Sequence, residues 1–182
     1  MKEPARRGPE LLTLCKLFSG PPSVPEWEVI DGHAMPEPYR RLLVHEEHMT
    51  VTMEEHWGRP LELRILERRQ DGERYARKIL LFCPRLGKAV LFGIMRFDFR
   101  WCSEEVKDEI VRGQTPLGQV LIEHDVMRRI APSAYLKITR SEELMQCFEL
   151  RAMRPMYGRL ATIYCDEEAA VELFEVVRPE DE

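Results

Sequence analysis

The sequence lacks long apolar runs and an excess of basic residues, and each absence excludes a class of protein. No apolar run approaches the roughly 18 residues that a membrane-spanning helix needs, and the N-terminus has no apolar segment with a small-residue cleavage site. The formal net charge is −5, which favours neither a nucleic acid nor an anionic membrane surface as a partner. We therefore expect no membrane and no nucleic acid among the partners of this chain.

The sequence also has no pattern typical of a disulfide framework or of a metal site. The five cysteines are odd in number and form no close pair, which is typical of reduced, buried thiols in a cytoplasmic protein. His45, His48 and His56 lie near one another, but no pattern of cysteine or aspartate accompanies them. We expect these histidines to cap helices or to pack, and we expect no metal site.

The length and composition predict one globular domain. The 182 residues are 44% hydrophobic and 32% charged, and a chain of this length buries roughly 70% of its unfolded surface. Residues 1–30 differ from the rest, because a short helical pattern over 11–18 is followed by prolines that cannot continue it. We expect residues 1–30 to form an N-terminal extension that wraps onto a domain of residues 31–182.

From Pro60 onward, apolar residues recur with a period of two, which is typical of β-strands. The turn at 70–72 joins the first two such segments into a hairpin. The grouping of helices between the third and fourth strands favours an α+β domain with a mainly antiparallel sheet of six strands. The predicted strands cover residues 61–68, 74–82, 89–101, 134–138, 158–164 and 169–177, and the predicted helices after the extension cover residues 38–45, 50–58, 103–113, 116–122 and 142–148.

The stretch from Gly113 to Ile122 ends one helix and begins another. Gly113 suits the residue after a helix, and Thr115 followed by Pro116 suits a cap and a first helical residue. A helix that begins here leaves backbone N–H groups free, and such groups can hold an anion. The alternative is a plain corner between two helices that pack on the sheet.

Five short segments within residues 38–178 resemble, in order, segments of the chorismate pyruvate-lyases, which make 4-hydroxybenzoate. They are Met49-Thr50, Arg74 to Leu81, Gly113 to Gly118, Gly158-Arg159 and Glu172-Leu173-Phe174. The triplet His48-Met49-Thr50 is similar to an uncharacterised branch of the same superfamily. The resemblance implies a single chorismate-lyase-like domain with covering flaps. It implies a lyase that eliminates pyruvate from chorismate, or from a similar aromatic-acid precursor, without a cofactor. We further expect a monomer whose partner is a small anionic aromatic or pre-aromatic acid.

The resemblance also implies the residues of the site. Arg77 matches the strand arginine that binds the carboxylate of the aromatic product, and Glu172 matches a glutamate at the opposite, oxygen-bearing end. Leu117 and Met49 match the positions that complete the pocket. We expect Arg77 and Glu172 to be catalytic, with Glu172 as the proton donor to the ether oxygen of chorismate. The strand pattern alone leaves an alternative, in which the two charges pair with each other or reach solvent at a sheet edge.

A binding module on the same fold is the alternative to an enzyme. Ligand-sensing domains of transcription regulators share the chorismate-lyase-like fold, and a fold does not determine a function. Residues 1–30 are too short and too rich in proline for a DNA-binding helix-turn-helix domain. The alternative is therefore a non-catalytic domain that binds an aromatic acid in the same pocket.

Overall fold

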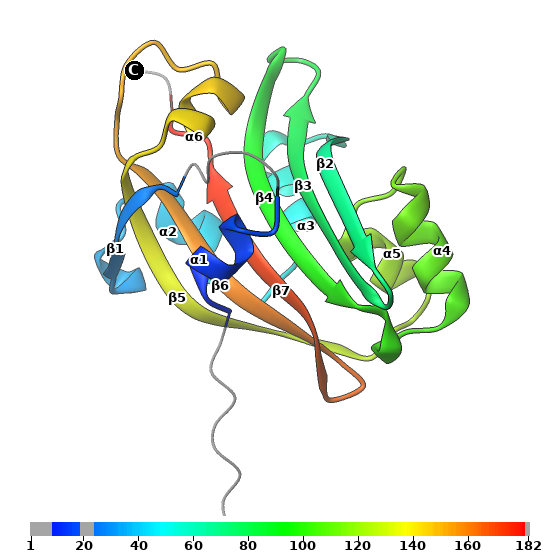
Figure 1. Ribbon diagram of the computed structural model, residues 1–182. Coiled ribbons are helices and arrows are strands. Elements are labelled where there is room, and N and C mark those ends of the chain that lie inside the picture. The colour runs from blue at the N-terminus through cyan, green and yellow to red at the C-terminus, as the bar shows by residue number, and fades with distance from the viewer. Residues whose placement is uncertain (1–8, 19–23, 181–182) are drawn as a thin grey trace, which may run out of the picture.

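One antiparallel sheet of seven strands organises the described part of the chain, which is residues 9–18 and 24–180 of a computed structural model (Figure 1). The strand order is β1-β5-β6-β7-β4-β3-β2. The strands are β1 (Glu26–Ile30), β2 (Glu62–Asp71), β3 (Arg74–Cys83), β4 (Lys88–Asp98), β5 (Arg128–Arg140), β6 (Met156–Cys165) and β7 (Glu168–Val177). The predicted α+β class is confirmed, with seven strands where the sequence predicts six.

The additional strand, β1, lies before residue 31, where we expect the domain to begin. It pairs with β5 at one edge of the sheet, and Val29 is 69% exposed, so the apolar residues of β1 show no regular pattern of burial. Strand β5 begins at Arg128, well before the predicted residue 134. Pro132 lies at a β-bulge of this strand, where proline is tolerated. The position of the domain boundary stays a prediction.

Helices cover both faces of the sheet, and each of the six α-helices of the described residues falls where a helix is predicted (Figure 1). On one face, α1 and α6 pack around Phe92 and Phe174. On the other face, α2 and α3 pack in one cluster around Leu81, and α4 and α5 pack in a second cluster around Phe97. The helices are α1 (Leu11–Cys15), α2 (Tyr39–Leu43), α3 (Met49–Trp57), α4 (Glu104–Arg112), α5 (Leu117–Glu123) and α6 (Glu142–Cys147).

The turn between α4 and α5 follows from its sequence. Gly113 ends α4 with a φ of 73°, in the left-handed region that favours glycine. A Cβ atom at this position would also lie 2.5 Å from Cδ1 of Ile65 on β2, so the Ile65 side chain would have to shift. Helix α5 begins at Leu117, one residue later than predicted, and Pro116 precedes it. The end of α4 and the start of α5 are thereby fixed above the sheet.

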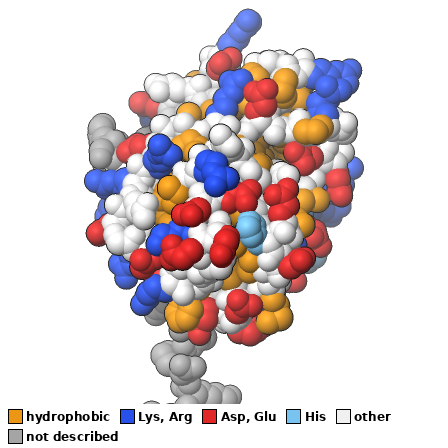
Figure 2. Space-filling view, turned by 90° about the vertical axis from the view of Figure 1, so that its right-hand side faces the viewer, with side chains coloured by type: hydrophobic (Ala, Val, Ile, Leu, Met, Phe, Trp, Pro, Cys, Tyr) orange, Lys and Arg blue, Asp and Glu red, His pale blue; other side chains and the backbone are white. Residues whose placement is uncertain are grey.

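The outer surface of α4 and α5 carries many acidic side chains (Figure 2). Glu104, Glu105 and Asp108 of α4 are exposed, while Val106 and Ile110 face the sheet. Helix α4 therefore has an apolar face on the sheet and a solvated outer face. Within residues 9–18 and 24–180, no helix is both long enough and apolar enough to cross a membrane.

Candidate functional site

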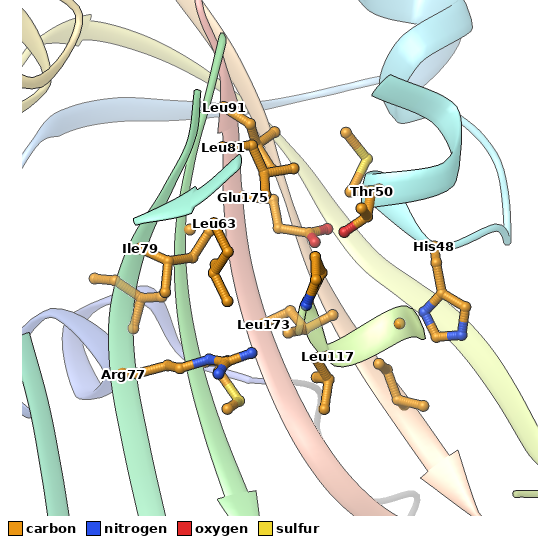
Figure 3. Close-up of a pocket in the computed structure, with 17 residues that line it drawn as sticks. His48, Thr50, Leu63, Arg77, Ile79, Leu81, Leu91, Leu117, Leu173 and Glu175 are labelled. Carbon is orange, nitrogen blue, oxygen red and sulfur yellow. The ribbon is translucent and has the colours of Figure 1, made fainter. Parts of the chain in front are cut away.

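One cavity brings together three of the four predicted site residues. Arg77 reaches it from β3, Met49 from the start of α3 and Leu117 from the start of α5 (Figure 3). The cavity has a volume of about 60 Å³ and lies between the two apolar clusters on the second face of the sheet. Most of its wall is apolar. The polar side chains that line it are Arg77, Glu175, His48 and Thr50.

The register of the sheet explains why a cavity forms here. Arg77 and Ile79 point to the same face of β3. Ile79 lies opposite Gly93 on β4, and Gly93 lies opposite Glu175 on β7. Because Gly93 has no side chain, space remains above β4, with β3 on one side and β7 on the other. Strands are spaced about 4.8 Å apart, so the backbones that carry Arg77 and Glu175 are separated by roughly 10 Å across the sheet.

Arg77 is a buried cation without an acidic partner among the described residues. It is 2% exposed, and its Nη1 donates a hydrogen bond to the carbonyl oxygen of Ile110 at 3.3 Å. Its Nε has no hydrogen-bond partner, and no carboxylate of residues 9–18 and 24–180 forms an ion pair with it. Burial lowers the pKa of Arg77 from its ordinary value, but a guanidinium group remains protonated in proteins.

The carboxyl end of α4 compensates the charge of Arg77 only in part. Ile110 lies in the last turn of α4, where the carbonyl oxygens carry a partial negative charge. One such hydrogen bond does not satisfy a guanidinium group, which has five N–H donors. Because an unpaired buried charge is costly, the arrangement favours an anion in the cavity beside Arg77.

Glu172, the fourth predicted site residue, does not line this cavity. It lies opposite Arg96 in the sheet, on the other face, and forms an ion pair with Arg96. Glu172 and Glu175 are three positions apart on one strand, so they point to opposite faces. The expectation that Glu172 faces Arg77 is thus corrected, because Glu175 takes that place. Arg77 and Glu172 do not pair with each other either.

Glu175 is held in position by Arg159, a fully buried residue of β6. Nε of Arg159 donates to the Glu175 carboxylate at 2.7 Å. The same guanidinium donates to the backbone carbonyl oxygens of His45, at 2.9 Å, and Glu47, at 3.1 Å. These carbonyl groups lie in the segment between α2 and α3. Arg159 therefore ties this segment to the sheet and fixes the carboxylate that borders the cavity.

His48 is a further cavity residue, for which the sequence predicts only capping or packing. It precedes α3, is 8% exposed and lines the cavity next to Gly118. Its Nε2 accepts a hydrogen bond from Nε of Arg128 at 2.8 Å. Burial, together with the nearby guanidinium group of Arg128, lowers the pKa of His48 from 6.5 to about 4. The ring is therefore neutral near pH 7.

The low pKa of His48 predicts an acid-sensitive contribution to stability. As the pH falls from 6.5 to about 4, the unfolded chain gains a proton at this residue and the folded chain does not. The free energy of unfolding therefore falls by up to about 3 kcal/mol at this residue as the pH is lowered across this range. We expect His48→Gln to lose less stability than wild type between pH 7 and pH 4.5 in urea titrations. His33→Gln, at an exposed histidine, is the matched control. An identical pH dependence in wild type and His48→Gln would contradict the burial of a neutral ring.

The other candidate chemistry of the chain is limited. No group of three or more His, Cys, Asp or Glu residues in the described part could hold a metal ion. The cysteines are free thiols, and burial raises the pKa of Cys102 to about 11 and that of Cys165 to about 12, which suits packing and not nucleophilic attack. The chemistry of the cavity therefore depends on Arg77, Glu175 and His48.

Comparisons with known proteins show the fold. No protein-family model and no curated protein sequence matches the chain. The ligand-binding domain of a putative GntR-family transcriptional regulator from Bordetella bronchiseptica is similar in structure, with 14% identity and a TM-score of 0.51 over 66% of this chain and 86% of that chain. A putative transcriptional regulator from Streptomyces coelicolor has 11% identity and a TM-score of 0.48, over 66% of this chain and 87% of that one. The C-terminal domain of the histidine utilization repressor from Pseudomonas syringae has 8% identity and a TM-score of 0.47, over 67% of this chain and 97% of that one. The similarity to the Bordetella bronchiseptica domain confirms the predicted chorismate-lyase-like fold.

Proposed function

We propose that this chain binds a small carboxylic acid in the cavity, with the carboxylate on Arg77. The observation that carries the proposal is a buried guanidinium group whose Nε has no hydrogen-bond partner and which has no acidic partner among the described residues. A carboxylate supplies the missing charge and can accept two parallel N–H hydrogen bonds from one guanidinium group. Met49 and Leu117 provide apolar walls for the rest of the ligand.

The size of the cavity limits the ligand. Its volume of about 60 Å³ is smaller than the roughly 150 Å³ of an engineered cavity that binds benzene, so an aromatic ring requires neighbouring side chains to move. Met49 and Met95 line the cavity, and the three rotatable bonds of methionine make such movement easy. Short aliphatic acids and single-ring aromatic acids are the two ligand classes to test.

Binding without catalysis is the function that we favour. The similar domain from Bordetella bronchiseptica is a ligand-binding domain of a putative regulator, which supports a binding role for this fold. Within the cavity, the Glu175 carboxylate accepts a hydrogen bond from Arg159 and so acts as an acceptor rather than a proton donor. Since that similar domain belongs to a putative transcriptional regulator, our expectation that nucleic acids are excluded as partners has no support.

Elimination of pyruvate from chorismate is the second candidate function. One observation favours it, which is the presence of a glutamate on the same sheet face as Arg77, although this residue is Glu175 and not Glu172. In that reaction Arg77 would bind the ring carboxylate, and Glu175 would have to supply the proton to the ether oxygen. A cofactor-free reaction, a monomeric state and a cytoplasmic location stay predictions.

Calorimetric titration of the full chain tests the proposal. The series of acids is acetate, butyrate, benzoate and 4-hydroxybenzoate, and a separate incubation with chorismate monitors pyruvate. We expect at least one acid to bind at a single site and chorismate to release no pyruvate. Release of pyruvate together with 4-hydroxybenzoate would instead establish the lyase. Failure of every acid to bind would contradict the proposal.

A further inference from the structure

The contact between Arg128 and His48 fixes the proton of the His48 ring. Nε of Arg128 lies 2.8 Å from Nε2 of His48, and Nη1 of Arg128 donates to the carbonyl oxygen of Val126 at 3.0 Å. A guanidinium group has donors and no acceptor. Nε2 must therefore present its lone pair to Arg128, and a neutral imidazole with a free lone pair at Nε2 carries its proton at Nδ1.

The Nδ1 atom of His48 lies on the side of the ring that faces the cavity. In Figure 3, one ring nitrogen points toward Leu117 and the other points away from the cavity, toward β5. A Cβ atom on Gly118 would lie 2.9 Å from Nδ1 and 2.7 Å from Cγ of His48, so any larger residue at this position would press on this side of the ring. Nδ1 makes no hydrogen bond within residues 9–18 and 24–180.

The cavity thus contains a second donor of a different kind from Arg77. Arg77 offers a full positive charge from β3, and His48 offers a single neutral N–H group from the opposite wall (Figure 3). The pKa of about 4 keeps His48 neutral over the ordinary range of pH, so this donor does not compete with Arg77 for an anion. A neutral N–H group is instead suited to a hydroxyl, ether or carbonyl oxygen.

The geometry points to His48 as a specificity-determining residue, whose Nδ1–H donates to a neutral oxygen of the ligand at the end remote from the carboxylate. Arg128 is the positioning residue that holds His48 in this tautomer. This inference rests on the proposed binding of a carboxylic acid at Arg77. It narrows the ligand to an acid that carries a second, uncharged oxygen.

Nuclear magnetic resonance reports the tautomer without any ligand. Long-range proton–nitrogen correlations of the ¹⁵N-labelled full chain at pH 7 should show His48 with a protonated Nδ1 and an unprotonated Nε2. The signals are assigned by their loss in His48→Gln. In Arg128→Met, Nε2 loses its donor, and we expect the ring to shift toward the Nε2-protonated form. A wild-type ring that is protonated at Nε2 would overturn the inference.

Matched pairs of acids report the role of His48 in binding. The pairs are benzoate with 4-hydroxybenzoate, and butyrate with 4-hydroxybutyrate. We expect wild type to bind the hydroxylated member of whichever pair fits about 3- to 10-fold more tightly, the value of one neutral hydrogen bond. His48→Gln retains an acceptor near the position of Nε2 but no donor at that of Nδ1, and it should lose the preference. His48→Asn retains a donor near the position of Nδ1, and it should keep much of the preference.

The failure of this inference is distinguishable from the failure of the proposed function. If wild type binds both members of a pair with equal affinity, or if His48→Gln keeps the preference, the inference about His48 is overturned and binding at Arg77 stands. If wild type binds neither member of either pair, the inference is overturned, and if acetate does not bind either, the proposed function is overturned with it.

Discussion

Arg77→Met is expected to abolish carboxylate binding and, at the same time, to stabilise the ligand-free chain. The substitution removes two charge-assisted hydrogen bonds to the ligand, so affinity should fall by at least about 100-fold. It also replaces a buried cation that has no acidic partner by an apolar side chain of similar length. Replacing a buried ion pair by apolar residues is often stabilising by about 1–4 kcal/mol, and we expect a gain of this order for Arg77→Met. The lost hydrogen bond to Ile110, about 1 kcal/mol, is smaller. Calorimetric titration and urea unfolding measure the two effects.

Two further variants isolate the role of Arg77. Arg77→Lys keeps a charge but not two parallel donors, so it should weaken binding by roughly 1.5–3 kcal/mol and give no gain in stability. Arg74→Met removes an exposed arginine from the same strand and should change neither quantity. A less stable Arg77→Met variant would mean that Arg77 serves the fold and not a ligand.

Arg159→Met is expected to cause a large loss of stability. The substitution leaves the Glu175 carboxylate buried without its partner and removes the donors to the carbonyl oxygens of His45 and Glu47. Removing one partner of a buried ion pair typically costs about 3–5 kcal/mol. Urea unfolding should therefore show a lower unfolding free energy by this amount. Arg77→Met and Arg159→Met both remove a buried arginine, and we expect effects of opposite sign on stability.

Arg96→Met is the matched control for Arg159→Met. Arg96 also pairs with a glutamate of β7, but both side chains of this Arg96–Glu172 pair are 29% exposed. A partly hydrated pair contributes about 0–1 kcal/mol, so this variant should remain close to wild type in stability. If Arg159→Met and Arg96→Met lost equal amounts of unfolding free energy, burial would not explain the contribution of the Arg159–Glu175 pair to stability.

Local patterns were sufficient to predict most of the fold. The period of two and the turn residues predicted six strands, because alternation of apolar and polar side chains follows directly from the pleat. Strand β1 could not be predicted in this way, because an edge strand with an exposed Val29 has no buried face to impose a pattern. Strand β5 is longer than the predicted strand over 134–138, because it continues back to Arg128 through a β-bulge at Pro132, where the alternation is interrupted.

The candidate site could be predicted only in part, because its polar contacts join distant segments. A lone charge on an apolar strand face drew attention to Arg77. The same pattern, together with the resemblance, indicates Glu172. Glu175 is not among the predicted site residues, and only the pairing of β4 with β7 shows which glutamate shares a face with Arg77. His48 and Arg128 are 80 residues apart in the sequence, and no local pattern indicates such a contact. The triplet His48-Met49-Thr50 was the single available signal for His48.

Our central claim is that Arg77 binds an anion in the cavity. The most direct test is a crystal structure of the full chain with the acid that binds most tightly. We predict that the carboxylate lies about 3 Å from the Arg77 guanidinium group, with the rest of the acid between Met49 and Leu117. The claim would be contradicted if the acid instead lay on the opposite face of the sheet, in the cavity bordered by Arg74 and Arg96, and left Arg77 without an anion.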